Sequence, residues 1–113
     1  MASVVKRSNE IINEYPDNLS SWHWLGLSSM ALGLFEQAAT AFKKTTQLNP
    51  RFAPGFNDLG VVTKELGHPL EAIEAFHQVL KLAPNDVEAI CNLGNAHHAI
   101  GQLDKAIMRY EQA

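Results

Sequence analysis

The chain has 113 residues, of which 46% are apolar and 19% are charged, and its formal net charge is −3. This composition is typical of one globular domain and excludes a disordered chain, while the mild acidity excludes a basic surface for nucleic acid or an anionic membrane. A single cysteine excludes an intrachain disulfide, and no apolar run approaches the roughly 20 residues that span a bilayer. We therefore expect a cytoplasmic protein with neither nucleic-acid nor membrane partners.

Apolar residues recur every three or four positions, as in Leu70, Ile73 and Phe76, and no segment alternates with a period of two. Glycines and prolines between the apolar stretches mark the helix ends. In chain order, the predicted helices span residues 3–15, 19–32, 36–49, 53–66, 70–82, 87–100 and 104–113. Asn18 or Ser20 is the expected N-cap of the second helix. The pattern therefore predicts an all-α fold of about seven helices.

Six series of residues recur with a period of 34, which indicates an internal repeat. The series are Leu25, Leu59 and Leu93; Gly26, Gly60 and Gly94; Gly33, Gly67 and Gly101; Ala38, Ala72 and Ala106; Phe42, Phe76 and Tyr110; and Pro16, Pro50 and Pro84. The Gly26 series lies inside predicted helices, where glycine costs about 1 kcal/mol relative to alanine, so we expect a neighbouring backbone or bulky ring to exclude a β-carbon there. The Gly33 series is expected to end the first helix of each unit in a left-handed conformation.

Two-helix units of 34 residues resemble the tetratricopeptide repeat, and the signature residues agree. In the first complete unit, the signature reads Trp22-x-x-Leu25-Gly26, then Ala38-x-x-x-Phe42 and Pro50. The resemblance spans the chain and implies one domain, 1–113, folded as a right-handed superhelical solenoid of helix-turn-helix repeats. Its parts would be the second half of a unit at 1–18, complete units at 19–52 and 53–86, and an incomplete unit at 87–113. The family's first-helix tyrosine is replaced at Ser29, Thr63 and His97.

The same resemblance implies a function, because the first helices of such units line a concave groove that binds a peptide or protein segment. Projecting the repeat onto this chain gives the groove residues Ser20, His23, Leu27 and Met30 from the first unit, Asn57, Val61, Lys64 and Glu65 from the second, and Glu88, Cys91, Asn95 and His98 from the third. This mixture of apolar and polar side chains suits an extended or helical peptide with a few apolar anchors. We expect a scaffold for protein–protein interaction.

Two more specific partner types within the family agree poorly with the groove. Relatives that clamp the C-terminal tails of heat-shock chaperones use lysines, asparagines and an arginine around a carboxylate. The corresponding positions here hold His23, Leu27, Asp58, Glu88 and Asn92, with no lysine or arginine and two acidic residues. Other relatives present a ladder of asparagines, and that ladder falls here on Trp24, Asp58 and Asn92.

Catalytic and metal-binding motifs are missing from the sequence, so we expect no enzyme activity, no cofactor and no metal. No nucleophile elbow, phosphate-binding glycine loop or zinc spacing occurs. Cys91 and His98 share a helix face, but two turns, about 10 Å, separate them, which is too far for a nucleophile–base pair. The alternative from another class is a substrate-recruiting arm of a larger enzyme, since similar arrays precede glycosyltransferase and sulfotransferase domains.

Both ends of the chain carry apolar residues without an evident covering helix. They are Val4, Val5, Ile11 and Ile12 in the first predicted helix and Ile107, Met108 and Tyr110 in the last. Solenoids normally end in elements with a polar outer face. We therefore expect that the chain belongs to a longer protein, or that the terminal helices pair in a homo-oligomer.

Overall fold

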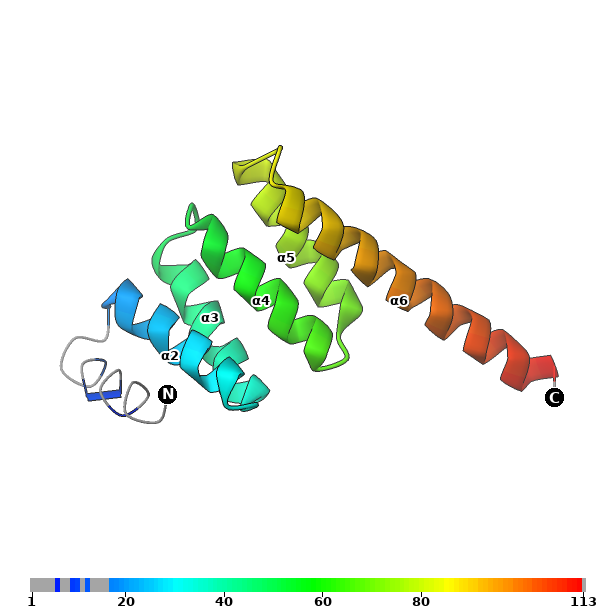
Figure 1. Cartoon of the computed structure of the whole chain (residues 1–113), viewed down its shortest axis with the longest axis horizontal. Helices are drawn as coiled ribbons and strands as arrows, with labels where there is room; N and C mark the ends of the chain where they lie inside the picture. Colours follow the sequence, from blue (N-terminus) through cyan, green and yellow to red (C-terminus); the bar gives the residue numbers. More distant parts are fainter. Residues whose placement is uncertain (1–5, 7–8, 11, 13–16, 113) are drawn as a thin grey trace.

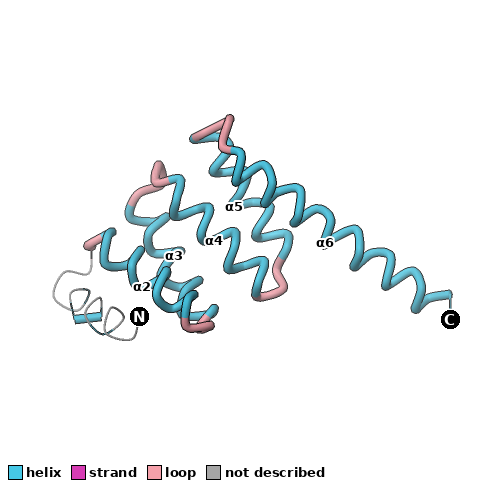
Figure 2. Tube along the Cα trace, viewed as in Figure 1, coloured by secondary structure: helices cyan, strands magenta, loops and turns pink. Residues whose placement is uncertain are grey.

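The computed structural model of the chain describes residues 6, 9, 10, 12 and 17–112, with side chains described as far as residue 102. Its helices are α2 (Leu19–Ala31), α3 (Phe35–Leu48), α4 (Ala53–Glu65), α5 (Pro69–Leu82) and α6 (Val87–Gln112). Each helix packs against the next one in the chain, and the stack measures 56 × 31 × 19 Å (Figure 1). Loops and turns connect these helices, and the described residues contain no strand (Figure 2). The all-α solenoid is thus confirmed, while most of the helix predicted at 3–15 lies outside the described residues.

The ends of α2 and α4 agree with the local sequence signals. The Asn18 side chain accepts a hydrogen bond of 3.0 Å from the backbone N–H of Ser21, so Asn18 is the N-cap. Gly33 and Gly67 adopt φ values of 78° and 82°. After Gly33, the backbone N–H of Leu34 donates to the Ser29 carbonyl, and the same bonding follows Gly67. Both helices therefore end in the Schellman arrangement that left-handed glycine permits.

A phenyl ring packed onto a glycine holds each complete helix pair together. A Cβ at Gly26 would lie 2.3 Å from the Phe42 ring, and one at Gly60 would lie 2.5 Å from the Phe76 ring. Both rings are fully buried. The predicted close approach of a bulky ring is confirmed at these two glycines, because only a residue without a β-carbon leaves room for the ring.

The third unit departs from this pattern. Helix α6 continues for 26 residues through Gly101, which the repeat predicted as a left-handed helix end. The predicted break between helices 87–100 and 104–113 is therefore wrong, and a single helix, α6, takes the place of these two predicted helices. Pro69 follows the glycine turn of the second unit and disfavours helical backbone before it, whereas Gly101 precedes Gln102 and Leu103, which obstruct nothing. A glycine inside a helix costs only about 1 kcal/mol relative to alanine, so Gly101 does not by itself end the helix.

Substituting Gly60→Ala is expected to lower the free energy of unfolding by about 1–3 kcal/mol, because the new methyl group overlaps the Phe76 ring. The double variant with Phe76→Leu should lose less than the sum of the two single variants, since the smaller side chain relieves the overlap. Urea unfolding followed by circular dichroism measures both effects. Additive losses would contradict the proposed ring–glycine contact.

The straight course of α6 is tested by comparing Gly101→Ala with Gly67→Ala. Alanine in a helix interior should raise stability by about 1 kcal/mol at position 101. At position 67 the left-handed backbone should make alanine destabilising by about 1 kcal/mol or more. Thermal and urea unfolding at one protein concentration give both values. Equal losses at the two positions would mean that Gly101 also forms a turn.

Candidate binding groove

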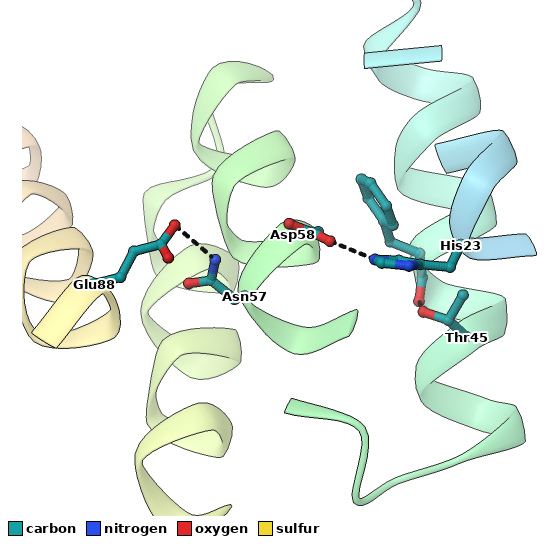
Figure 3. A network of polar contacts seen from close by, with 6 residues as sticks. His23, Thr45, Asn57, Asp58 and Glu88 are labelled. Carbon is teal, nitrogen blue, oxygen red and sulfur yellow. Dashed lines mark hydrogen bonds and ion pairs between the residues drawn. The ribbon is translucent and has the colours of Figure 1, made fainter. Parts of the chain in front are cut away.

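Polar side chains connect the first helix of each unit to the first helix of the next. Nε2 of His23 on α2 donates to Oδ2 of Asp58 on α4 at 2.7 Å (Figure 3). Nδ2 of Asn57 on α4 donates to Oε1 of Glu88 on α6 at 3.2 Å, and Nδ2 of Asn92 donates to Oδ1 of Asn57 at 3.3 Å. These bonds form a polar ladder (His23, Asp58, Asn57, Glu88 and Asn92) across α2, α4 and α6. The ladder lies on the helices to which the repeat assigned the groove.

Two bonds of the polar ladder share one sequence offset. His23 with Asp58, and Asn57 with Asn92, are each separated by 35 residues, one repeat plus one position. A residue at the His23 position of one unit therefore contacts the residue one place further along in the next unit. Trp24 occupies that further position in the first unit, and its side chain is 57% exposed. This offset is the sequence signal that would have identified Asp58 and Asn92 as groove residues paired with a neighbouring unit.

His23 is held on several sides by neighbouring residues. Its ring meets the Phe52 ring edge to face at 5.1 Å and lies 6.1 Å from the Phe42 ring. The side chains of His23 and Asp58 retain only 20% and 19% of their exposure. His23 therefore links the first unit to the second, and the predicted contact between His23 and a ligand is limited to the remaining exposed edge.

Three of the predicted apolar groove residues also pack against buried clusters that contain residues of two successive units. Leu27 and Met30 lie against the buried cluster of Ala38, Ala39, Phe42 and Val62. Val61 lies against Ala72, Phe76 and Ala96. All three are half-buried, so part of their apolar surface is used in packing and only the rest is accessible.

The remaining predicted residues divide by exposure. Asn57 and Lys64 are half-buried, whereas the exposed members are Ser20, Glu65, Glu88, Cys91, Asn95 and His98. Cys91 is a free thiol. The accessible part of the predicted groove is thus mainly polar, and most of it belongs to α6.

An acidic hollow lies where the N-terminal ends of α4 and α6 meet. It encloses about 240 Å³ and is lined by Ala53, Pro54, Asn57, Asp58, Asp86 and Glu88. Asp86 also caps α6 by accepting a hydrogen bond of 3.0 Å from the backbone N–H of Ala89. Asp86 was not among the predicted groove residues, although an Asp before a helix start is a recognisable capping signal. Three carboxylates therefore give this part of the groove a negative character.

A second hollow, of about 570 Å³, lies between α3, α4 and α5. Its lining residues are Lys43, Phe56, Leu59, Thr63, Glu71, Glu74, Ala75 and Gln78. None of the predicted groove residues contributes to it. This hollow is the gap between second helices of neighbouring units, on a different part of the surface from the acidic hollow.

Metal-ligating side chains do not gather within the described part of the chain. No three His, Cys, Asp or Glu residues lie close enough there to hold an ion together. His97 and His98 are both exposed on α6. Among the same residues, no helix combines the length and apolar character needed to cross a membrane.

Two family models, both described as tetratricopeptide repeat, match residues 19–52 and 65–113. The chain belongs to the tetratricopeptide repeat family. Curated relatives include the Protein CTR9 homolog of Arabidopsis thaliana, 27% identical over 92% of this chain, and Superkiller protein 3 of Saccharomyces cerevisiae, 31% identical over 80%. The chain spans only 10% and 6% of these relatives' lengths.

Several solved structures have the same fold. The MamA protein superposes with a TM-score of 0.84 at 20% identity, covering 95% of this chain and 58% of MamA. The first tetratricopeptide domain of Spaghetti (RPAP3), bound to the HSP90 peptide SRMEEVD, gives 0.82 at 21% identity over 86% of this chain and 77% of that domain. O-GlcNAc transferase from Thermobaculum terrenum gives 0.76 at 29% identity over 83% of this chain and 18% of the enzyme.

The bond between His23 and Asp58 is expected to stabilise the stacking of the first two units. A double-mutant cycle with His23→Ala and Asp58→Ala should give a coupling free energy of about 0.5–1.5 kcal/mol, because both partners are largely buried. The matched cycle on Asn57 and Glu88, of which Glu88 is exposed, should give less than about 0.5 kcal/mol. Urea unfolding measures both cycles, and equal couplings would show that burial adds nothing to the first pair.

Proposed function

We propose that the chain is a protein-interaction module that holds a segment of a partner protein along the concave face of α2, α4 and α6. It carries out no reaction of its own. The family membership supports binding of protein or peptide partners in general. The negative charge of the acidic hollow and the exposed ring of Trp24 add a preference for a segment with a basic and an apolar residue.

The observation that carries this proposal is the acidic hollow beside the polar ladder. Asp58, Asp86 and Glu88 line a cavity of about 240 Å³ that is large enough for one side chain. A lysine or arginine side chain is the natural occupant, since carboxylates pair with cationic donors at hydrogen-bonding distance. Trp24 stands at the same repeat position as Asp58, one unit earlier, and its exposed ring offers an apolar or cation–π contact. The favoured partner segment therefore carries a basic residue and an apolar residue.

The peptide bound by the Spaghetti (RPAP3) domain has the opposite charge character. Its sequence SRMEEVD carries three acidic residues towards its C-terminal end. Carboxylates of such a peptide would face Asp58 and Glu88 here, and like charges at short range oppose binding. The chaperone-tail type of partner is therefore not the one that we propose for this groove.

A displayed library of random peptides of about 12 residues tests this specificity. Selected peptides should be enriched in lysine or arginine together with an aromatic or aliphatic residue. The variant Glu88→Lys should weaken the best binders by at least tenfold, since it replaces an attractive charge with a repulsive one. The matched control is Glu74→Lys, which makes the same charge change beside the hollow between α3, α4 and α5 and should alter affinity by less than twofold.

Trp24→Ala provides a second arm of the same measurement by isothermal titration. Exposed aromatic anchors commonly contribute a large share of the binding free energy, so a tenfold loss is expected. Selection of acidic peptides, or equal losses in Glu88→Lys and Glu74→Lys, would contradict binding in the acidic part of the groove.

A second candidate function is that of a substrate-recruiting arm of a larger enzyme. It is favoured by the 29% identity to a stretch that makes up 18% of O-GlcNAc transferase from Thermobaculum terrenum. The groove would then select the protein substrate of a catalytic domain on the same polypeptide. Sequencing the gene beyond the codon for residue 113 decides between the two: a glycosyltransferase or sulfotransferase domain there would support the recruiting arm.

A further inference from the structure

The hollow of about 570 Å³ between α3, α4 and α5, which we call the α3–α5 hollow, has a counterpart one unit earlier. That counterpart encloses about 250 Å³, and its lining residues are Asn9, Trp22, Leu25, Gln37, Thr40 and Ala41. Each of them has an equivalent 34 positions later in the lining of the α3–α5 hollow. A hollow at this place is therefore a product of the repeat, and the side chains that line it distinguish one unit from the next.

The lining of the α3–α5 hollow is charged where that of its counterpart is neutral. Three neutral residues of the counterpart are replaced by charged ones: Asn9 by Lys43, Gln37 by Glu71 and Thr40 by Glu74. All three charged side chains are exposed, and none of them belongs to an ion pair within the described part of the chain. Their charges are therefore available to a ligand that enters the hollow.

The two walls of the α3–α5 hollow stand apart above an apolar floor. Helices α3 and α5 both pack on α4, but no Cα atom of one lies within 8 Å of a Cα atom of the other. Between them, the half-buried side chains of Phe56 and Leu59 on α4 and the buried Ala75 on α5 form the floor. The hollow therefore offers an apolar surface between two polar walls, which is the usual composition of a binding site.

The positive and negative charges lie at opposite ends of the hollow. The Thr45 hydroxyl lies 2.8 Å from the position of a Cβ at Gly55, so Lys43 on α3 stands beside the first turns of α4. Glu71 stands near the last turn of α4, because it lies in the first turn of α5 and residues 66–68 alone connect the two helices. Glu74 follows Glu71 one turn further along the same wall.

We propose that the α3–α5 hollow is a second docking site, which takes a segment of another protein in which a basic and an acidic residue flank an apolar one. The apolar side chain lies on Phe56 and Leu59. The basic side chain pairs with Glu71 and Glu74 at one end, and the acidic side chain pairs with Lys43 at the other. The α4 residues that line the hollow extend over about 10 Å of helix axis, which an extended segment of about four residues covers.

A second copy of this chain suits the hollow less well than a foreign segment does. Among the described residues, Leu70 and Val87 are the most exposed large apolar side chains, at 73% and 71%. Glu71 follows Leu70, and Asp86 and Glu88 flank Val87. Docking of either side chain would bring further carboxylates to the two on α5, and like charges at short range oppose binding.

Peptide selection on a chain with an altered groove tests this site separately from the proposed groove. Trp24→Ala together with Glu88→Lys removes the ring and reverses the charge on which groove binding depends, so peptides of the same displayed library that still bind should use the α3–α5 hollow. These peptides should carry an apolar residue between a basic and an acidic one. The proposal is overturned if no peptide is selected, or if the selected peptides carry charges of one sign only.

Titration of the selected peptides against single variants locates their site. Lys43→Glu and Glu74→Lys should each weaken binding by at least about tenfold, because each places a like charge against the peptide. The matched control is Glu36→Lys, the same charge change on an exposed residue of α3 that lines neither hollow, and it should alter affinity by less than twofold. Circular dichroism checks that the variants keep their helices. Equal losses in Glu36→Lys and Glu74→Lys would place the binding elsewhere and overturn the proposal.

Reversing a charge in the peptide tests the pairing with Lys43. A selected peptide whose acidic residue is replaced by lysine should bind the Lys43→Glu variant at least about tenfold more tightly than it binds the unmodified chain, since every charge facing it in the hollow is then attractive. A merely structural effect of Lys43→Glu cannot produce this recovery. Equal affinity for the two chains would show that Lys43 does not contact the peptide and would rule out the proposed arrangement.

Discussion

The packing of a phenyl ring onto a bare glycine backbone determines the shape of each complete unit. Phe42 fills the space beside Gly26, and Phe76 fills the space beside Gly60, with overlap distances that no β-carbon could tolerate. This contact sets how closely the two helices of a unit approach each other. It also requires the chain to turn back after the first helix, which the left-handed glycines Gly33 and Gly67 allow.

Once the units have this common shape, they stack in a regular way and the groove follows. Leu27 and Val61 occupy equivalent positions, and each packs against a buried cluster that joins its own unit to the next one. The stacking brings His23 to Asp58 and Asn57 to Asn92 at the same offset of 35 residues. Part of the surface predicted as the groove is therefore buried in contacts between units. Its accessible remainder is the acidic hollow, the exposed ring of Trp24 and the outer residues of α6.

The third unit differs from the first two, since no described atom lies within 4 Å of the position of a Cβ at Gly94. Gly94 is open, α6 does not turn, and His97 is exposed although its counterparts Ser29 and Thr63 are buried. These differences occur together, because a first helix stays exposed where no described second helix turns back on it.

Local sequence was sufficient for every feature whose physical cause lies within a few residues. The period of 34, the Asn18 cap, the left-handed Gly33 and Gly67 and the bounds of four helices to within one residue at each end all follow from such causes. The groove residues stay a prediction, which rests on the recurrence of equivalent positions in each unit. Sequence could not specify which of them the neighbouring unit occupies, since this depends on how successive units are offset when they stack.

The course of the chain at Gly101 was likewise decided by tertiary structure alone. Gly101 has the same local surroundings that predict a turn at Gly33, yet it lies inside a continuous helix. A glycine permits both conformations, and the ring–glycine contact described for the first two units is present where the chain turns at Gly33 and Gly67. The sequence by itself thus determined the repeat and its two complete helix pairs. Whether the third unit turns back is visible only in the tertiary structure, because the residues around Gly101 permit both a turn and a continuous helix.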